Sequence, residues 1–335
     1  MSGAEIAREF IKKMPRASDM AIVRGLMTKY PLIFRSKEST RSTVRIQRGT
    51  MKRTNGDGKR EYKKNPLPKT PFTRENPYNL PESHAEEQPP FILPVACNNV
   101  LVISDLHIPY HNIKAITACL DYGKKEKINC IVINGDLLDF YMYSKFGKDP
   151  RKRSPKHEIE DAVSFLTSLR SIFPHVPIYW IYGNHDIRYE TFLKSVAPSL
   201  YEDDYYKLED RMGLAKLKVK ALNDKTIIKA GHLDILHGHT IFKMSPANPA
   251  QTAITRYPGA NLLIGHTHKI TSFTTNTWDR DKIYTCETTG CLCELRPEYD
   301  SMNVKNSHGF AHVKVDKNGY FAVRNIRIFN GKILG

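Results

Sequence analysis

Short apolar stretches of this 335-residue chain end in side chains that can bind metal ions. In the clearest case, the β-branched residues 131–133 are followed by Asn134, Gly135 and Asp136 and, three residues later, by Asp139. Four other apolar runs end in a similar way, and such runs are typical of buried strands that deliver polar groups to a sheet edge. The Asp, Asn and His side chains at the five ends are Asp105, His107, Asp136, Asn184, His237, His266 and His268.

These side chains have the chemistry of a metal centre. Ligands of open α/β proteins bind outside the carboxyl ends of the strands, so five strand ends can bring all these groups into one cleft. A mixture of carboxylate, amide and imidazole ligands suits Mn²⁺, Fe or Zn²⁺ and is a poor match for Ca²⁺. The number of ligands is too large for one ion of ordinary coordination and suits two.

The pattern from residue 98 onward predicts the elements that position these groups. Apolar strand-like runs alternate with helical periodicity at residues 113–125 and 158–171, which indicates βαβ units and a largely parallel sheet. After residue 281, residues 284–289, 310–315 and 321–329 alternate like antiparallel strands. The predicted fold class is therefore α/β.

Five short motifs occur in order along this region. They are Asp105-x-His107, Gly135-Asp136-x-x-Asp139, Gly183-Asn184-His185-Asp186, His237-Gly238 and Gly265-His266-x-His268. Together they resemble the calcineurin-like metallophosphoesterase family over roughly residues 97–330, and the surrounding sequence is similar to phosphoesterases of bacteriophages and prophages. The resemblance implies a four-layer α/β/β/α sandwich that hydrolyses phosphate esters with a metal-activated hydroxide.

The resemblance also implies a role for each metal-binding residue. Asp136 would bridge two divalent metal ions, with Mn²⁺ as the expected metal and Fe, Zn²⁺ or Ni²⁺ as alternatives. The first ion would be completed by Asp105, His107 and His268, and the second by Asn184, His237 and His266.

Two further residues are implied to be catalytic. His185 would face the scissile oxygen, where it stabilises the phosphoryl charge or protonates the leaving group. Asp139 would pair with His185 and keep it cationic, and the alternative for Asp139 is a carboxylate at a helix start. His239 is expected to lie outside the first shell of ligands, and Arg188 is a candidate for phosphate contact.

Positive charge is concentrated at the beginning of the chain. Residues 1–74 hold 19 Lys or Arg against 6 Asp or Glu, a net charge of +13. The remaining 261 residues hold 32 against 29, a net charge of +3. Concentrated positive charge is typical of a nucleic-acid-binding segment, and a solubilising arm is the alternative.

Three short amphipathic helices are predicted before residue 50. Ser18 and Ser36 are suitable N-caps for the second and third of them. Arg41, Arg45 and Arg48 follow the spacing i, i+4, i+7 on one face of the third helix. The pattern resembles a helix-turn-helix module and favours a nucleic-acid interface, and a small helical bundle docked on the enzyme is the alternative.

Three regions are predicted along the chain: a helical module at 1–50, a basic, proline-rich linker at 51–96 and a phosphoesterase domain at 97–335.

The six cysteines do not suggest a disulfide framework in a chain of this size. The N-terminus does not read as a signal peptide, and no stretch is long enough to span a bilayer. We expect a cytoplasmic protein, in the host cytoplasm if it is phage-encoded.

Three functions are consistent with these features. The first is a two-metal phosphodiesterase or nuclease directed to nucleic acid by residues 1–50. The second is a phosphomonoesterase acting on phosphoprotein or nucleotide, because the same motifs serve monoesters and diesters. The third is a DNA-binding protein with an inactive phosphoesterase domain, which the presence of every expected ligand disfavours.

Overall fold

The structure, a computed structural model, describes residues 2–49, 84–85, 87–145, 154–242, 246–278, 281–297 and 305–334. The chain divides into two compact units, Met1–His84 and Ala85–Gly335. Most of the predicted linker at 51–96, namely residues 51–83, lies outside the described residues.

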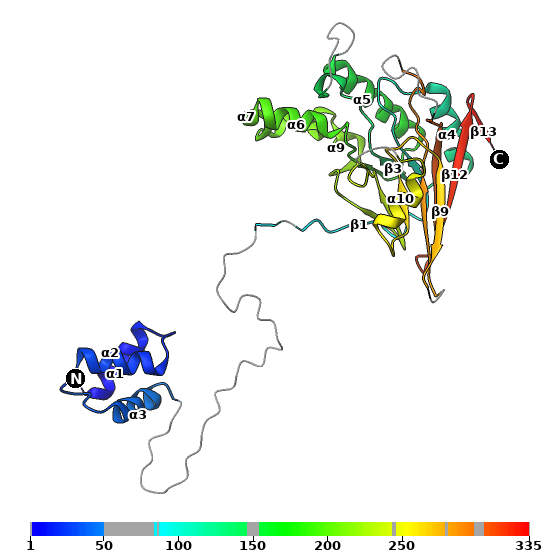
Figure 1. The fold of residues 1–335 in the computed structure, drawn as a ribbon. Helices are drawn as coiled ribbons and strands as arrows, with labels where there is room; N and C mark the ends of the chain where they lie inside the picture. The colour runs from blue at the N-terminus through cyan, green and yellow to red at the C-terminus, as the bar shows by residue number, and fades with distance from the viewer. Residues whose placement is uncertain are drawn as a thin grey trace. The chain divides into compact units, whose positions relative to one another are not determined.

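The helices of the first unit are α1 (Gly3–Lys13), α2 (Asp19–Lys29) and α3 (Lys37–Gln47) (Figure 1). Each begins at a serine, because the side chains of Ser2, Ser18 and Ser36 accept a hydrogen bond from a backbone N–H three residues on. The three apolar faces share a small core: Ile6, Ala7, Ile22, Val23, Leu26, Phe34 and Val44. The prediction of three short helices is confirmed.

The arginines of α3 do not form an unengaged cationic stripe. Arg48 donates from Nη1 to Asp19 Oδ1 at 2.8 Å and from Nη2 to the carbonyl of Ala17. Arg45 Nε lies 3.9 Å from Asp19 Oδ2, whereas Arg41 is exposed. The carboxylate in the first turn of α2 therefore contacts two of the three arginines predicted for nucleic acid, and Arg41 is left exposed.

The second unit contains two β-sheets. The strands of one are β2 (Asn99–Ile103), β3 (Cys130–Asn134), β4 (Ile178–Ile181), β5 (Val219–Leu222), β11 (Gly309–Val315), β12 (Phe321–Phe329) and β13 (Lys332–Leu334). The strands of the other are β1 (Phe91–Ile92), β6 (Ile228–Ala230), β7 (Leu233–Leu236), β8 (Leu262–Ile264), β9 (Thr271–Asn276) and β10 (Ile283–Thr288). Their orders are β13-β12-β11-β2-β3-β4-β5 and β1-β6-β7-β8-β10-β9.

Both sheets are mixed: the predicted parallel strands and the predicted antiparallel strands after residue 281 are both present, but they share the same sheets. Strands β2 to β5 are parallel, whereas β11, β12 and β13 are antiparallel to their neighbours. In the second sheet β10 is parallel to β8 and antiparallel to β9. Side chains alternate with a period of two in either kind of pairing, so the sequence of one strand does not report the direction of its neighbour.

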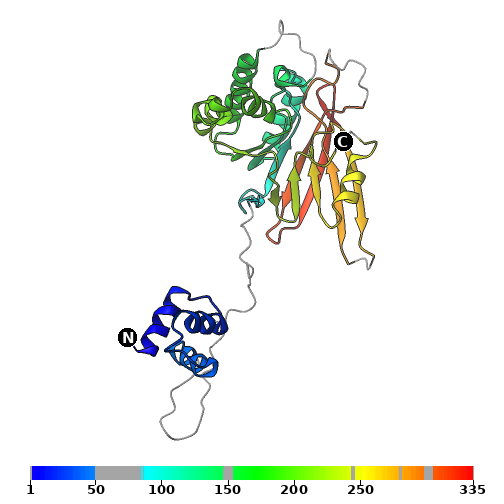
Figure 2. The ribbon, with the colours of Figure 1, turned by 60° about the vertical axis from the view of Figure 1, so that its left-hand side comes forward.

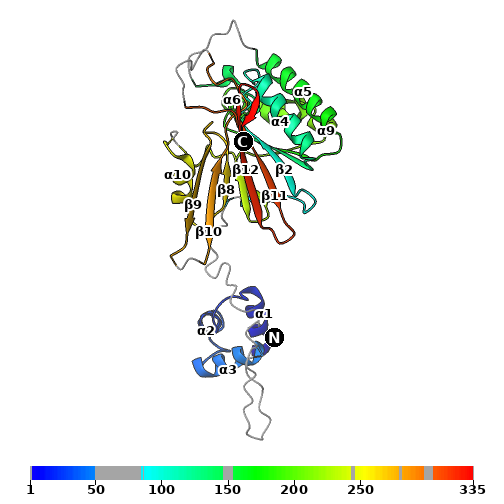
Figure 3. The same cartoon turned by 90° about the vertical axis from the view of Figure 1, so that its right-hand side faces the viewer.

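Helices cover the outer face of each sheet. Helices α4 (Ile113–Lys125) and α5 (Pro155–Ile172) pack on the seven-stranded sheet, and α10 (Pro249–Arg256) packs on the six-stranded sheet. Figures 2 and 3 show the two sheets between these helices. This is the α/β/β/α order that the resemblance implied.

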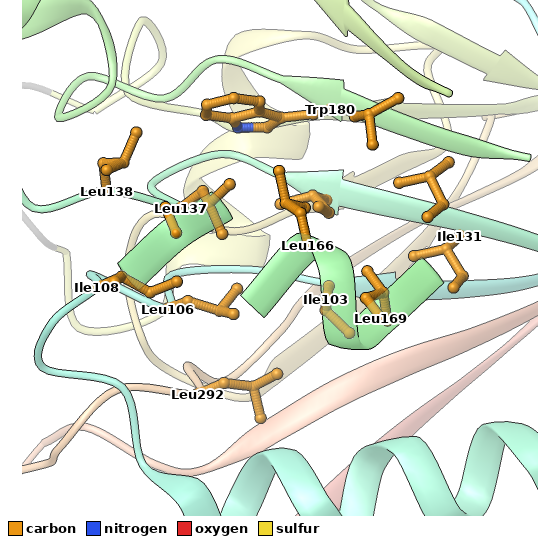
Figure 4. Close-up of a cluster of buried hydrophobic side chains, with 14 of the residues drawn as sticks. Ile103, Leu106, Ile108, Ile131, Leu137, Leu138, Leu166, Leu169, Trp180 and Leu292 are labelled. Carbon is orange, nitrogen blue, oxygen red and sulfur yellow. The ribbon is translucent and has the colours of Figure 1, made fainter. Parts of the chain in front are cut away.

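The side chains of strand β2 belong to two different hydrophobic cores. Leu101 and Ile103 belong to the core beneath the helices, together with Trp180 (Figure 4). Val100 and Val102 belong to the core between the two sheets. Because successive side chains of a strand point to opposite faces, a strand buried on both sides has a continuous apolar sequence.

Shorter elements connect the layers. They are η1 (Tyr141–Tyr143), α6 (Ile187–Val196), α7 (Pro198–Tyr201), η2 (Asp204–Tyr206), α8 (Leu208–Arg211) and α9 (Leu214–Leu217).

The last residues of the predicted linker belong to the second unit, because Phe91 pairs with Ile228 and Leu93 is buried between the sheets. No helix in the described part of the chain has the length and apolar character needed to cross a membrane.

Candidate metal centre

The strand ends that carry the predicted ligands meet between the two sheets. Strands β2, β3 and β4 belong to one sheet, and β7 and β8 to the other. Ile103 is in register with Ile133, and Leu236 is in register with Ile264, so each set of strands stops at a common edge. The sequence predicted a shared edge, and the structure forms the site from two facing sheets instead of one open sheet.

The backbone turns sharply where the ligands lie. Among the described residues, nine other than glycine have a positive φ, and five of them are predicted metal ligands. These five are Asp105 (φ 56°), His107 (48°), Asp136 (52°), His266 (62°) and His268 (55°). Left-handed backbone is unfavourable for residues with a Cβ and concentrates at functional sites, so the fold stabilises this conformation to direct the side chains.

Glycines of the motifs leave space for the ligands. A Cβ on Gly183 would lie 2.8 Å from Asp136 Cγ and closer still to Oδ1. A Cβ on Gly135 would lie 2.8 Å from Cε1 of His237. Side chains at these two positions would displace the ligands, which is a physical reason for the Gly-Asp and Gly-Asn pairs in the sequence.

Four predicted ligands form the first group. His268 Nε2 lies 3.2 Å from Asp105 Oδ1 and 3.2 Å from His107 Nε2. His107 Nε2 lies 3.7 Å from Asp136 Oδ2 and 4.0 Å from Asp105 Oδ1. Two carboxylate oxygens and two imidazole nitrogens therefore converge on one small volume.

The second group shares Asp136 with the first. His237 Nε2 lies 3.2 Å from Asp136 Oδ2 and 3.2 Å from Asn184 Oδ1. Ligand atoms of His266, His237 and Asp136 lie within 4.8 Å of one another. The structure thus brings together all seven predicted ligands in two groups joined by one carboxylate.

Hydrogen bonds on the far side of the imidazoles set their orientation. His237 Nδ1 donates to the carbonyl of Asn134 at 2.8 Å, and His107 Nδ1 lies 3.1 Å from Asp139 Oδ1. A carbonyl only accepts, so Nδ1 of His237 carries a hydrogen and Nε2 is the ring nitrogen that faces the centre. Such partners are the usual support of metal-binding histidines.

The donor set fits cations. Asp105 and Asp136 are buried, and no described residue donates to Asp105 Oδ1 in hydrogen-bond geometry. Burial alone would raise the pKa of Asp105, but the imidazoles of His268 and His237 lower it to about 2, so the carboxylate is ionised. Two buried carboxylates require positive charge nearby, which a divalent cation would supply.

His185 and Asp139 lie beside the centre. His185 Nδ1 is 3.0 Å from the carbonyl of Asp139 and 3.1 Å from its Oδ1, as the predicted pairing requires. However, burial lowers the pKa of His185, and Arg188 Nη2 lies 3.0 Å from its Nε2. The predicted pairing with Asp139 is therefore present, but the pKa of His185 moves downward and not upward, because desolvation outweighs the carboxylate.

Asp186 organises the loop between β4 and α6. Its buried carboxylate accepts from the backbone of Leu138 at 2.9 Å and of Gly183 at 2.8 Å, and from Trp180 Nε1 at 3.3 Å. Burial, followed by the charge of Asp136, raises the pKa of Asp186 to about 7. This side chain ties together the loops that carry Asp136 and Asn184.

His239 lies outside both groups. Its Nε2 is 3.3 Å from Asp224 Oδ2, and its ring centroid is 5.5 Å from that of His237. These contacts agree with a place behind the ligands.

Sequence reasoning missed two neighbours of His268. Cys293 Sγ lies 4.0 Å from His268 Nδ1, and Asn306 Nδ2 lies 3.2 Å from the same atom. Neither residue belongs to one of the five motifs, so neither was predicted to lie near the ligands.

Comparisons with known proteins agree with this geometry. The family model for calcineurin-like phosphoesterases matches residues 99–270. The Gene 54 protein of Mycobacterium phage D29 is 29% identical over 178 residues, which are 51% of this chain and 69% of the relative. Its counterpart from Mycobacterium phage L5 is 28% identical over the same shares of both chains.

Solved structures with similar folds include Vacuolar Protein Sorting 29 from Cryptosporidium parvum, with a TM-score of 0.41, 15% identity and coverage of 71% of this chain and 94% of that one. The phosphoesterase Yfce from E. coli has a TM-score of 0.32, 14% identity and coverage of 69% of this chain and 100% of that one. The match of the family model to more than half of the sequence shows that the chain belongs to the calcineurin-like phosphoesterase family.

Proposed function

We propose that the chain is a two-metal phosphoesterase that hydrolyses phosphate esters and acts on nucleic acid. One observation carries the hydrolytic part of the proposal. Asp136 Oδ2 lies 3.7 Å from His107 Nε2 in the first ligand group and 3.2 Å from His237 Nε2 in the second. A carboxylate oxygen shared between two ligand groups supports a pair of cations.

Two divalent cations, when bound, neutralise phosphoryl oxygens and acidify a water molecule. The residues that would hold them are Asp105, His107, Asp136 and His268 for one, and Asp136, Asn184, His237 and His266 for the other. Asn184 contributes a neutral oxygen, which limits the negative charge that a phosphate ester meets. Asp139 and the carbonyl of Asn134 orient imidazoles from behind.

Manganese is the metal that we propose, with Fe, Zn²⁺ and Ni²⁺ as alternatives. The donor set combines four imidazoles with two carboxylates and one amide oxygen. Imidazole-rich sites suit first-row transition metals, whereas Mg²⁺ and Ca²⁺ prefer oxygen ligands.

The first unit supports nucleic acid as the partner. Residues 2–49 carry eleven Lys or Arg against four Asp or Glu, a net charge of +7. Lys37 and Arg41 are exposed on α3, while Arg45 and Arg48 contact Asp19. A helical unit with a basic exposed helix suits phosphate-backbone contact.

The hydrolytic proposal is tested with purified full-length protein loaded with Mn²⁺. Bis-nitrophenyl phosphate, nitrophenyl phosphate, a phosphopeptide, and single- and double-stranded DNA are compared as substrates. We expect hydrolysis of the small diester and of DNA. Rapid phosphate release from monoesters with no cleavage of either diester would favour a phosphomonoesterase instead, and no turnover of any substrate would contradict an enzymatic function.

The nucleic-acid part has a separate test. The double variant Lys37→Glu and Arg41→Glu should weaken DNA binding and reduce the slope of log affinity against log salt by about 2. The ratio of DNA cleavage to bis-nitrophenyl phosphate hydrolysis should fall. Unchanged DNA affinity at low salt would contradict DNA binding by the first unit, and it would not affect the hydrolytic part of the proposal.

A further inference from the structure

Arg188 is held directly beside the candidate metal centre. It is the second residue of α6, which follows the loop that carries Asn184 and His185. Its Nη1 donates to the carbonyl of Asp139 at 2.9 Å, and its Nη2 lies 3.0 Å from His185 Nε2. The side chain is half-buried, so its position is set by these contacts within the fold.

These contacts hold the His185 ring between two partners. Its Nδ1 lies 3.0 Å from the carbonyl of Asp139, which only accepts, so Nδ1 carries a hydrogen. Its Nε2 faces an arginine nitrogen, which only donates, so Nε2 is the acceptor in this contact. Both nitrogens of His185 are therefore engaged, and the ring fixes the position of the guanidinium.

His185 places the arginine close to the bridging carboxylate. The backbone N–H of His185 donates to Asp136 Oδ1 at 2.8 Å, and its ring centroid lies 4.4 Å from that of His107. Arg188 is therefore one side chain away from both ligand groups. Two of its five N–H groups are used in the hydrogen bonds that the described residues show, which leaves three for a further acceptor.

We propose that Arg188 is a catalytic residue that binds the non-bridging phosphoryl oxygens of the substrate, and that His185 is its positioning residue. The proposal rests on the phosphoesterase function proposed above. A guanidinium keeps its charge at every working pH and presents parallel donors that match two phosphoryl oxygens. A preorganised cation of this kind stabilises the charge of the transition state without reorganisation.

The test compares Arg188→Ala and Arg188→Lys with wild type in the full-length, Mn²⁺-loaded protein. Kinetics on bis-nitrophenyl phosphate and the affinity for inorganic phosphate, measured by calorimetry, are the two readouts. For Arg188→Ala we expect kcat/KM to fall by about 10²- to 10³-fold. Phosphate affinity should fall roughly 10- to 100-fold. Arg188→Lys should recover only part of both, because an ammonium lacks the planar pair of donors.

The variant His185→Ala tests whether Arg188 binds phosphate itself or acts only by supporting His185. In His185→Ala, Arg188 keeps its hydrogen bond to the carbonyl of Asp139. If Arg188 binds phosphate, the double variant His185→Ala and Arg188→Ala therefore binds phosphate more weakly than His185→Ala alone. Equal phosphate affinity in these two proteins would mean that Arg188 acts only through His185, and it would overturn the proposal.

Arg211→Ala is the matched control. Arg211 Nη1 donates to the hydroxyl of Tyr189 at 3.1 Å, and its guanidinium lies 5.4 Å from that ring, away from the ligand groups. Its loss should leave phosphate affinity and kcat/KM within about twofold of wild type. Metal content and thermal unfolding of each variant show whether the centre and the fold are retained.

The outcomes distinguish the two proposals. If wild type hydrolyses none of the esters, the proposed function fails, and the phosphate titrations still decide whether Arg188 contacts an anion. If wild type is active and Arg188→Ala keeps its phosphate affinity, the phosphate-binding role of Arg188 is contradicted and the phosphoesterase function is not.

Discussion

Replacement of Gly183 by alanine tests whether the loop after β4 determines the position of the shared carboxylate. The added Cβ would lie 2.8 Å from Asp136 Cγ, whereas carbon atoms in contact are about 3.5–4.0 Å apart. The Cβ would also overlap the backbone nitrogen of Asp136, so the carboxylate and its backbone must shift by roughly 1 Å. The carboxylate cannot do so freely, because Asp136 Oδ1 accepts a hydrogen bond of 2.8 Å from the backbone of His185.

The expected loss follows from this displacement. A misplacement of about 1 Å in a catalytic group lowers the rate about 10²-fold. Overpacking a rigid interior lowers the free energy of unfolding by about 1–3 kcal/mol. We therefore expect Gly183→Ala to lose about two orders of magnitude in kcat/KM for bis-nitrophenyl phosphate and to bind Mn²⁺ more weakly.

A second glycine variant separates the two effects. Gly213 has a φ of +62° and nothing within 4 Å of an added Cβ, so Gly213→Ala should lose about 1–2 kcal/mol through backbone strain and no activity. Metal content by elemental analysis, chemical denaturation and kinetics are measured on both variants. A Gly183→Ala protein with two bound Mn²⁺ ions and kcat/KM within threefold of wild type would refute the steric argument.

Three other perturbations have defined outcomes. Asp136→Asn should abolish hydrolysis, because a neutral amide cannot replace the bridging charge; metal analysis should show fewer than two ions, and an unchanged rate would contradict the two-metal proposal. Burial lowers the pKa of His312 below its ordinary 6.5, so protons bind first to the unfolded chain and stability falls as the pH drops below about 6.5. His312→Gln should flatten that dependence in denaturation curves from pH 7 to 5, and an equal slope would exclude His312 as a cause. Arg48→Ala should lower the stability of the first unit by about 1.5–3 kcal/mol, because the hydrogen bonds to Asp19 and to the carbonyl of Ala17 are lost. Exposed Arg41→Ala should change it by less than about 0.5 kcal/mol in thermal unfolding.

The sequence allowed the ligand set to be predicted because the signal is local. Each ligand follows an apolar strand within a few residues, and a glycine precedes Asp136, Asn184 and His266. Because the five motifs occur in the order typical of one family, the resemblance also predicted the fold. Helix starts were predictable for the same reason, since an N-cap serine acts on a backbone N–H only three residues away.

Other features depend on segments that are distant in the sequence, so the neighbouring residues do not predict them. The division of the strands between two facing sheets, and the parallel pairing of β10 with β8, follow from how the elements pack. Cys293 and Asn306 lie between β10 and β11 along the chain, and their approach to His268 depends on how those strands pair.

The charges of particular side chains also depended on the folded environment. Sequence reasoning paired His185 with Asp139 and expected a cation, but the balance of burial, carboxylate and Arg188 decides the protonation. Likewise Arg48 followed the spacing of an exposed stripe, and Asp19 on another helix engages it. The sequence by itself determined which groups are available and where the chain must turn, because those properties are carried by neighbouring residues. Only the tertiary structure decided their charges and partners, because solvation and electrostatic energy depend on every group that lies nearby in space.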